Sequence, residues 1–211
     1  MARRNRVSPF GAIEVSPAKG LFLGNRGILV DANGEIRRPH AHRNWVCCTL
    51  VPRNGGTVRF DSPDHYTPLF FWDEAVALSA GHRPCAQCRH VDYKAFKAAF
   101  AIAAGGVDAA TLTSGQMDAM LHADRIDGRQ KRTFRMALSN LPSGCFFTQA
   151  GRPEVAFLWH GDKAYPWSHS GYGAPVALDP ATLVDVLTPK RTVATIKAGY
   201  EPQLRLGLGA R

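Results

Sequence analysis

Two cysteines separated by two residues, Cys85 and Cys88, have the spacing in this chain that most directly indicates chemistry. They lie in the stretch Ala80-Gly-His-Arg-Pro-Cys-Ala-Gln-Cys-Arg89. At the start of a helix, one turn brings two thiolates to the same face, at a separation that a tetrahedral ion can bridge. Unpaired backbone N–H groups and the helix dipole stabilise thiolates there. The pair therefore predicts two zinc ligands at the start of a helix.

Two other interpretations of the pair remain open, a thioredoxin-like redox pair and two ordinary cysteines. A redox pair is expected after the first strand of a thioredoxin-type unit. Here the pair follows about eighty residues of mostly β-like sequence and a short helix. The zinc interpretation is therefore favoured.

Structural zinc normally takes four protein ligands, so further donors must come from elsewhere. Cys47 and Cys48 are the obvious donors. Adjacent side chains on a strand point to opposite faces, so we expect one of them to reach the metal, and we favour Cys48. Three protein ligands plus an open position would permit Lewis-acid chemistry, whereas four would make a closed structural site. The fourth ligand stays undetermined among water and His40, His42, His65, His82, His90 and Cys145.

Basic residues gather in two places that would suit contacts to phosphate. One group follows a predicted helix, with only Asp124 and Asp127 as nearby acids, and the other flanks the predicted zinc-bound helix start. Helix N-termini themselves bind phosphate. The alternative is a solvated charged face. The predicted nucleic-acid-binding residues are Arg83, Arg89, Lys94, Arg125, Arg129, Lys131, Arg132 and Arg135.

A loop rich in aromatic, hydroxyl and glycine residues, Tyr165 to Gly173, has the composition of a ligand-facing segment or a packed Ω-loop. It contains His169, and the pair His40-Ala-His42 is similarly suggestive. No Ser-His-Asp spacing or paired carboxylates name a reaction. His42 and His169 are the candidate catalytic residues.

Elements predicted from the pattern give an α+β fold: a β-rich N-terminal zinc module with helices, then a basic helical segment and a small antiparallel β meander. Residues 1–20 are expected to form a flexible basic arm, and order to begin near Leu21. Residues 21–106 form the zinc module. Residues 107–211 form the helical segment and meander, packed on the first part as one compact unit. The expected strands cover 28–30, 45–51, 57–60, 68–71, 145–148, 155–159, 164–167 and 182–187, and the expected helices cover 73–79, 85–102, a segment from Ser114, and 193–198.

Composition sets the broad class. The 211 residues include 26 Lys and Arg against 17 Asp and Glu, giving a net charge of +9, which suits a polyanion partner. No apolar run approaches the roughly 20 residues needed to cross a bilayer, so we expect a cytoplasmic protein with no membrane partner. Five cysteines in a reducing compartment favour free thiols or metal ligands over disulfides. Nothing indicates the oligomeric state.

The run from Phe70 to Arg89 resembles the second half of the Ada-type metal-binding domain. In that family a short helix leads into Ala-Gly-aromatic-Arg-Pro-Cys-x-x-Cys, and the two cysteines bind zinc. The resemblance implies zinc at Cys85 and Cys88, and it implies a role in DNA methylphosphotriester repair. This chain has His82 at the aromatic position and adjacent Cys47-Cys48 in place of an upstream C-x-x-x-C pair. The chain also resembles a bacterial family of similar length, which implies no activity.

The first functional hypothesis is a zinc protein that contacts nucleic acid, in particular DNA, in repair or the response to alkylation. A nuclease or nucleic-acid-modifying enzyme with a structural zinc is the first alternative. A structural or interaction protein with a zinc brace is the second.

Overall fold

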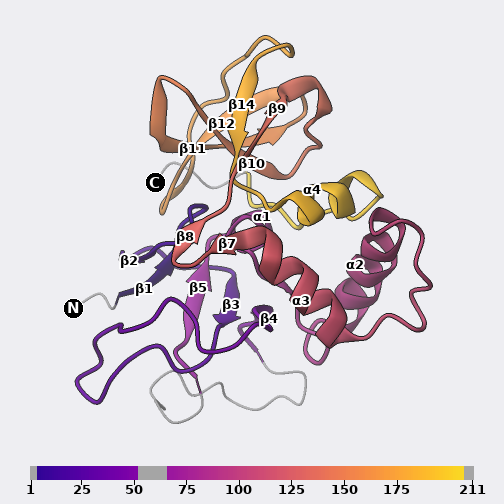
Figure 1. Cartoon of the computed structure of the whole chain (residues 1–211). Coiled ribbons are helices and arrows are strands. Elements are labelled where there is room, and N and C mark those ends of the chain that lie inside the picture. Colours follow the sequence, from indigo (N-terminus) through magenta and orange to yellow (C-terminus); the bar gives the residue numbers. More distant parts are fainter. Residues whose placement is uncertain (1–3, 52–65, 207–211) are drawn as a thin grey trace.

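The computed structural model describes residues 4–51 and 66–206. This part of the chain has a mixed α+β fold with two six-stranded sheets, a two-stranded hairpin and four α-helices. In Figure 1 the C-terminal sheet forms the upper part of the molecule, and the N-terminal sheet forms the lower left part. Helices α2, α3 and α4 lie together at the lower right. None of the helices in these two ranges is both long and apolar enough to cross a membrane.

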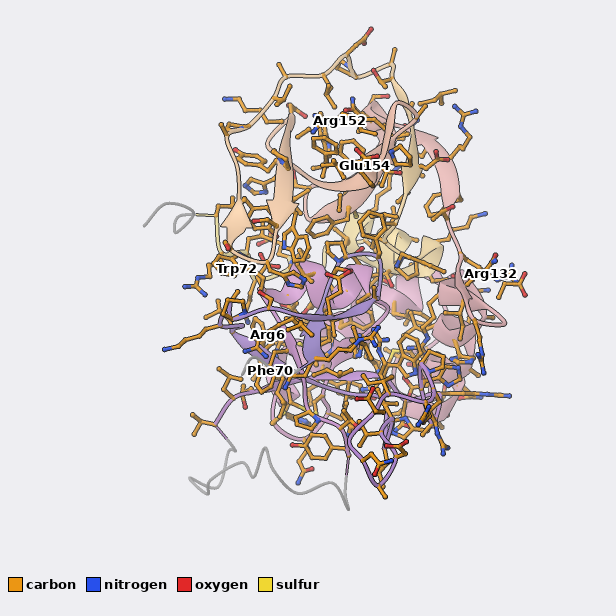
Figure 2. All side chains as sticks on the ribbon, turned by 90° about the vertical axis from the view of Figure 1, so that its left-hand side faces the viewer. Arg6, Phe70, Trp72, Arg132, Arg152 and Glu154 are labelled. Carbon is orange, nitrogen blue, oxygen red and sulfur yellow. The ribbon has the colours of Figure 1, made fainter. Side chains whose placement is uncertain are left out.

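The N-terminal sheet has the order β2-β1-β5-β3-β4-β6. Strand β3 pairs antiparallel with both β4 and β5, and the short β6 pairs parallel with β4. Figure 2 shows Arg6 and Phe70 side by side where β1 pairs with β5, with the guanidinium 4.7 Å from the ring centre. The strands are β1 (Arg4–Val7), β2 (Ile13–Val15), β3 (Phe22–Asn25), β4 (Val46–Thr49), β5 (Leu69–Phe71) and β6 (Arg83–Pro84).

The C-terminal sheet is antiparallel throughout, in the order β13-β12-β11-β10-β14-β9. Its central hairpins agree with the predicted meander, because the turn residues lie between alternating apolar runs. The strands are β9 (Phe134–Ala137), β10 (Cys145–Gln149), β11 (Arg152–His160), β12 (Lys163–Ser168), β13 (Gly171–Tyr172) and β14 (Leu183–Val186).

Two of the four helices, α1 and α3, begin at a residue whose side chain caps the helix. Asp73 caps the first through a bond from the Val76 amide, and Thr113 caps the third in a reciprocal capping box with Gln116. A short 3₁₀ turn covers Leu138–Asn140. Helix α4 packs against α2 and α3. The helices are α1 (Glu74–Ser79), α2 (His90–Ala103), α3 (Ser114–Arg125) and α4 (Lys190–Lys197).

Both faces of the β10–β11 hairpin are buried, which joins the two halves of the chain. Phe147 and Phe157 on one face pack with residues of α2, α3 and α4. Phe146 and Leu158 on the other face pack with residues of α1 and the N-terminal sheet. Because successive strand residues point to opposite faces, one hairpin contributes to both hydrophobic clusters. The first hydrophobic cluster therefore joins the C-terminal sheet to α2, α3 and α4, and the second joins it to α1 and the N-terminal sheet.

Three expected segments differ in the structure. Residues 4–15, where a flexible arm was expected, form β1 and β2, and Val7 is buried. The basic segment expected to be helical leaves the helix at Arg125 and forms the hairpin β7 (Ile126–Asp127) and β8 (Gln130–Lys131). Gly128 has a positive φ of 58°, which suits the hairpin turn and not a helix. The strand expected at 28–30 makes only a single bridge, Val30 to Ile36, and the strand expected at 57–60 lies outside the described residues.

The close contact between β3 and β5 gives a first prediction, for Gly24→Ala. An added Cβ would lie 2.4 Å from Cε2 of Phe71, whose ring is fully buried. Overpacking of this kind lowers the free energy of unfolding by about 1–3 kcal/mol. Urea unfolding of the variant measures it. Gly115→Ala is the matched control, because nothing lies within 4 Å of its Cβ position and the helical residue should gain about 0.5–1 kcal/mol. Equal effects of the two substitutions would contradict the contact.

Candidate metal centre

Three cysteine sulfurs meet at the edge of the N-terminal sheet. The Sγ atoms of Cys48, Cys85 and Cys88 all lie within 4.8 Å of one another. Cys48 belongs to β4, and the other two follow β6. The parallel pairing of β4 with β6, continued by a 2.9 Å bond from the Cys85 amide to the Cys47 carbonyl, brings the two segments together.

This donor set fits a tetrahedral zinc ion. Sulfurs bound to zinc at about 2.3 Å lie about 3.8 Å apart, which needs only a small contraction of the group. All five cysteines are free of disulfides. Among the residues described by the structure, no fourth His, Cys, Asp or Glu joins the three. The described part of the chain therefore supplies a three-thiol site that can hold a metal ion.

The turn Cys85 to Arg89 shapes the site. Its backbone closes with a 3.1 Å bond from the Arg89 amide to the Cys85 carbonyl, and α2 begins only at His90. The two cysteines thus precede the helix, whereas the sequence pattern placed Cys85 within it. Pro84 explains the difference, because it belongs to β6 and not to a first helical turn. Interactions with Cys48 and Cys88, and amides of Cys88 and Gln87, lower the pKa of Cys85.

The three thiols share their protons unequally. Interactions with Cys85 and Cys88, followed by burial, raise the pKa of Cys48. Three thiolates this close would destabilise one another, because close negative charges repel each other. A divalent cation would remove this repulsion and displace the remaining protons. Burial first, and then the Cys48 and Cys88 sulfurs, raise the pKa of the Tyr66 hydroxyl.

Cys47, one of the two upstream donors considered, points away from the cluster. It is fully buried, and its sulfur accepts a 3.4 Å hydrogen bond from Nη1 of Arg89. Burial raises the pKa of its thiol. Alternation along β4 is the cause, since adjacent residues on a strand face opposite sides. Cys47 therefore packs in the core while Cys48 faces the other two cysteines.

Among the described residues, the other candidates for a fourth ligand do not join the three sulfurs. His40 and His82 pack against Trp45, each with ring centres 5.4 Å from it. His90 is exposed, and its Nδ1 contacts the Ala86 carbonyl. Cys145 is buried in the hydrophobic cluster around the helices. His42 is described below, and His65 lies outside the described residues.

Arg83 and Arg89, two predicted phosphate contacts, are buried and paired. The Arg83 guanidinium binds Asp118 of α3 at 2.7 Å, and that of Arg89 binds Glu74 of α1 at 2.9 Å. Buried ion pairs of this kind are not free to bind an external anion. The two arginines instead anchor the cysteine turn to helices at both of its ends.

Two more of the predicted phosphate contacts turn inward. Arg125 is 1% exposed and donates to the carbonyls of Gly81 and Arg43. Lys131 is half-buried, donates to the Ser79 carbonyl, and has its pKa lowered to about 7 by burial and then by Arg26. The remaining predicted contacts, Lys94, Arg129, Arg132 and Arg135, are exposed. Arg132 projects from the edge of the molecule (Figure 2) and makes a 3.2 Å surface ion pair with Asp127.

The two candidate catalytic histidines lie on different elements and share no partner. His169 follows β12, and its Nε2 is 2.6 Å from a carboxylate oxygen of Glu14 on β2. His42 lies in the segment before β4, where its carbonyl accepts a bond from the Trp45 indole. Burial lowers the pKa of His42, and Asp118 opposes this effect. The structure does not bring these two residues together with the cysteines.

Sequence reasoning missed several residues of this region. Tyr66 lacks any local pattern, and Glu74 looks like an ordinary first-turn acid. His122 of α3 has its ring 5.0 Å from that of His40. Burial, then Arg125, lowers the pKa of His122 to about 4. Of these three residues, only Glu74 could have been found from the sequence, because an acidic residue at the start of a predicted apolar helix is a candidate for a buried ion pair.

Comparison of the chain with protein-family models, with curated proteins and with solved structures gives no match.

Proposed function

We propose that this chain is a zinc-binding protein that contacts nucleic acid. The convergence of the Cys48, Cys85 and Cys88 sulfurs from two separate segments is the observation that carries the proposal. Soft thiolate ligands select zinc among the common divalent ions. Bound there, zinc would supply a bridge between β4 and the turn before α2.

The nucleic-acid part of the proposal is supported by charge. The chain carries a net charge of +9, and four of the predicted contacts are exposed. Arg129, Arg132 and Arg135 follow one another along the hairpin β7–β8 and strand β9. Such exposed guanidinium groups suit phosphates of a strand. The resemblance to the Ada-type domain connects this binding to DNA repair or the response to alkylation.

Zinc content and DNA binding should be measured on one preparation of the full chain. About four phosphate contacts predict a slope near −3.6 for log affinity against log salt on duplex DNA, or about a hundredfold loss between 50 and 200 mM. Fluorescence anisotropy of a labelled duplex of 20 base pairs gives this slope. Removing Arg132 and Arg135 together should reduce its size by about 1.8.

Absence of DNA binding at low salt, or binding insensitive to salt, would contradict the nucleic-acid proposal. Zinc bound without any DNA affinity would instead favour the structural or interaction protein. Conversion of the labelled DNA to shorter products would favour the enzyme, with His42 and His169 as the residues to substitute.

A further inference from the structure

A cavity of about 390 Å³ opens between the N-terminal sheet and the β7–β8 hairpin. Its wall combines segments that are far apart in the sequence: β1 and the turn after it, the residue that follows β3, the loop 36–39 and the hairpin turn. Small-molecule sites commonly have volumes of about 300–1,000 Å³. The cavity is distinct from the cysteine cluster, since no cysteine lines it. Its arginines are Arg4, Arg26, Arg37, Arg38 and Arg129.

The cavity carries an excess of positive charge. No acidic residue is among its lining residues. Arg37 is held by Asp31 at 2.6 Å, but no described carboxylate forms an ion pair with the other four arginines. The positive charges around this cavity repel each other, which makes their electrostatic interaction energy unfavourable. An anion bound between them would be attracted to each arginine and would make the total interaction energy favourable. The lining therefore favours an anionic ligand.

Arg26 gives the cavity a fixed cationic wall. It is 2% exposed, and its guanidinium lies 4.2 Å from the centre of the Trp45 ring. It donates to the Gly11 carbonyl, the Ala80 carbonyl and His82 Nε2, which uses three of its five N–H groups. Burial, and then the neighbouring Arg125, lower its pKa, the direction expected where a cation lacks a counter-charge. Arg26 thus has donors left for an anion, in a fixed position.

The remaining lining suits the organic part of such a ligand. Phe10, Ile36 and Pro39 supply apolar surface beside the arginines. A nucleotide combines a phosphate with a planar base that packs on apolar and aromatic groups. A terminal phosphate carries up to two negative charges, against one for a phosphate within a strand, so several unpaired arginines favour the terminal group.

We propose that this cavity binds the terminal phosphate of a nucleotide, either free or at the end of a nucleic-acid strand. The strand form of the ligand depends on the nucleic-acid function proposed above, whereas the free-nucleotide form does not. Arg26 fixes the phosphate, and the exposed Arg38 and Arg129 close on it from the loop and the hairpin turn. Neither Arg38 nor Arg129 makes a hydrogen bond or ion pair with any described residue, so their removal should leave the fold intact.

The test uses the full chain and a short single-stranded oligonucleotide carrying either a 5′-phosphate or a 5′-hydroxyl. The phosphorylated form should bind at least about tenfold more tightly, the effect of one charge-assisted hydrogen bond. Adenosine 5′-monophosphate should compete for the site. The double variant Arg38→Ala/Arg129→Ala should lose both effects. Arg152→Ala removes one charge from β11, in the other sheet (Figure 2), and should keep both effects.

The outcomes separate this site from the proposed function. Equal affinity for the two oligonucleotides, without competition by the monophosphate, overturns the site even if DNA binding is strong. A preference that persists in the double variant also overturns it. Binding of the monophosphate that depends on Arg38 and Arg129, without binding of any strand, establishes the site for free nucleotides and rejects the nucleic-acid function.

Discussion

Removal of bound metal is expected to lower the thermal midpoint of this protein by about 8–16 °C. At a free zinc concentration about a thousand times the Kd, binding stabilises the folded chain by about 4.1 kcal/mol. For a chain of this size, each kcal/mol raises the thermal midpoint by about 2–4 °C. The physical reason is the position of the ligands, since zinc would bridge Cys48 on β4 to the Cys85 to Cys88 turn, and the strand that pairs with β4 before this turn, β6, has two residues. Calorimetry before and after dialysis against a chelator measures the shift, and elemental analysis should find about one zinc ion per chain beforehand.

Matched cysteine variants connect this shift to the proposed ligands. Cys88→Ser should lose the metal and show the low midpoint with or without chelator. Cys47→Ser removes a neighbouring sulfur that faces the core, so it should keep the metal and the response to chelator. A wild-type protein purified without metal, and unable to take up zinc, would reject the metal centre. An unchanged midpoint after complete removal of zinc would reject its role as a brace.

Loss of the buried carboxylate in Glu74→Ala is expected to reduce the free energy of unfolding by about 3–5 kcal/mol. The side chain is fully buried, and its Oε1 is 2.9 Å from the Arg89 guanidinium. The Tyr200 hydroxyl and the Gln203 amide also donate to this carboxylate. Its removal leaves a buried guanidinium and two other donors with fewer partners, which is costlier than the loss of an exposed contact. Equilibrium unfolding in urea, with zinc present throughout, measures the loss.

Asp127→Ala is the control for this prediction, because it removes a carboxylate from an exposed ion pair. Asp127 and Arg132 are 76% and 51% exposed, so this substitution should cost at most about 1 kcal/mol. Zinc affinity supplies a second readout for Glu74→Ala. Arg89 directly follows Cys88, so an Arg89 side chain without its ion-pair partner should position Cys88 less well, and zinc should bind more weakly. A cost for Glu74→Ala no larger than that for Asp127→Ala would show that the ion pair with Arg89 does not support the cysteine turn.

Local sequence patterns determined several elements of the fold. Apolar runs between turn residues predicted the central strands of the C-terminal sheet, and Asp73 indicated where α1 begins. The start of α3 was predicted at Ser114, whereas the capping residue is Thr113 and Ser114 is the first helical residue. The C-x-x-C spacing identified Cys85 and Cys88 as a pair, and strand alternation explains why only one of Cys47 and Cys48 can face them. These patterns act over a few residues, where spacing along the chain fixes spacing in space.

Tertiary structure alone decided which basic side chains are exposed and available to bind an anion. Arg83 finds its partner Asp118 35 residues away, and Arg125 donates to the carbonyl of Arg43. The cavity that we assign to a terminal phosphate likewise joins Arg4 to Arg129 through segments that meet only in the folded chain. Composition counts charges but does not say where they lie, because burial and pairing depend on contacts between residues that are distant in the sequence. The sequence therefore determined the cysteine pair and the positive charge, and the fold decided which charges face solvent.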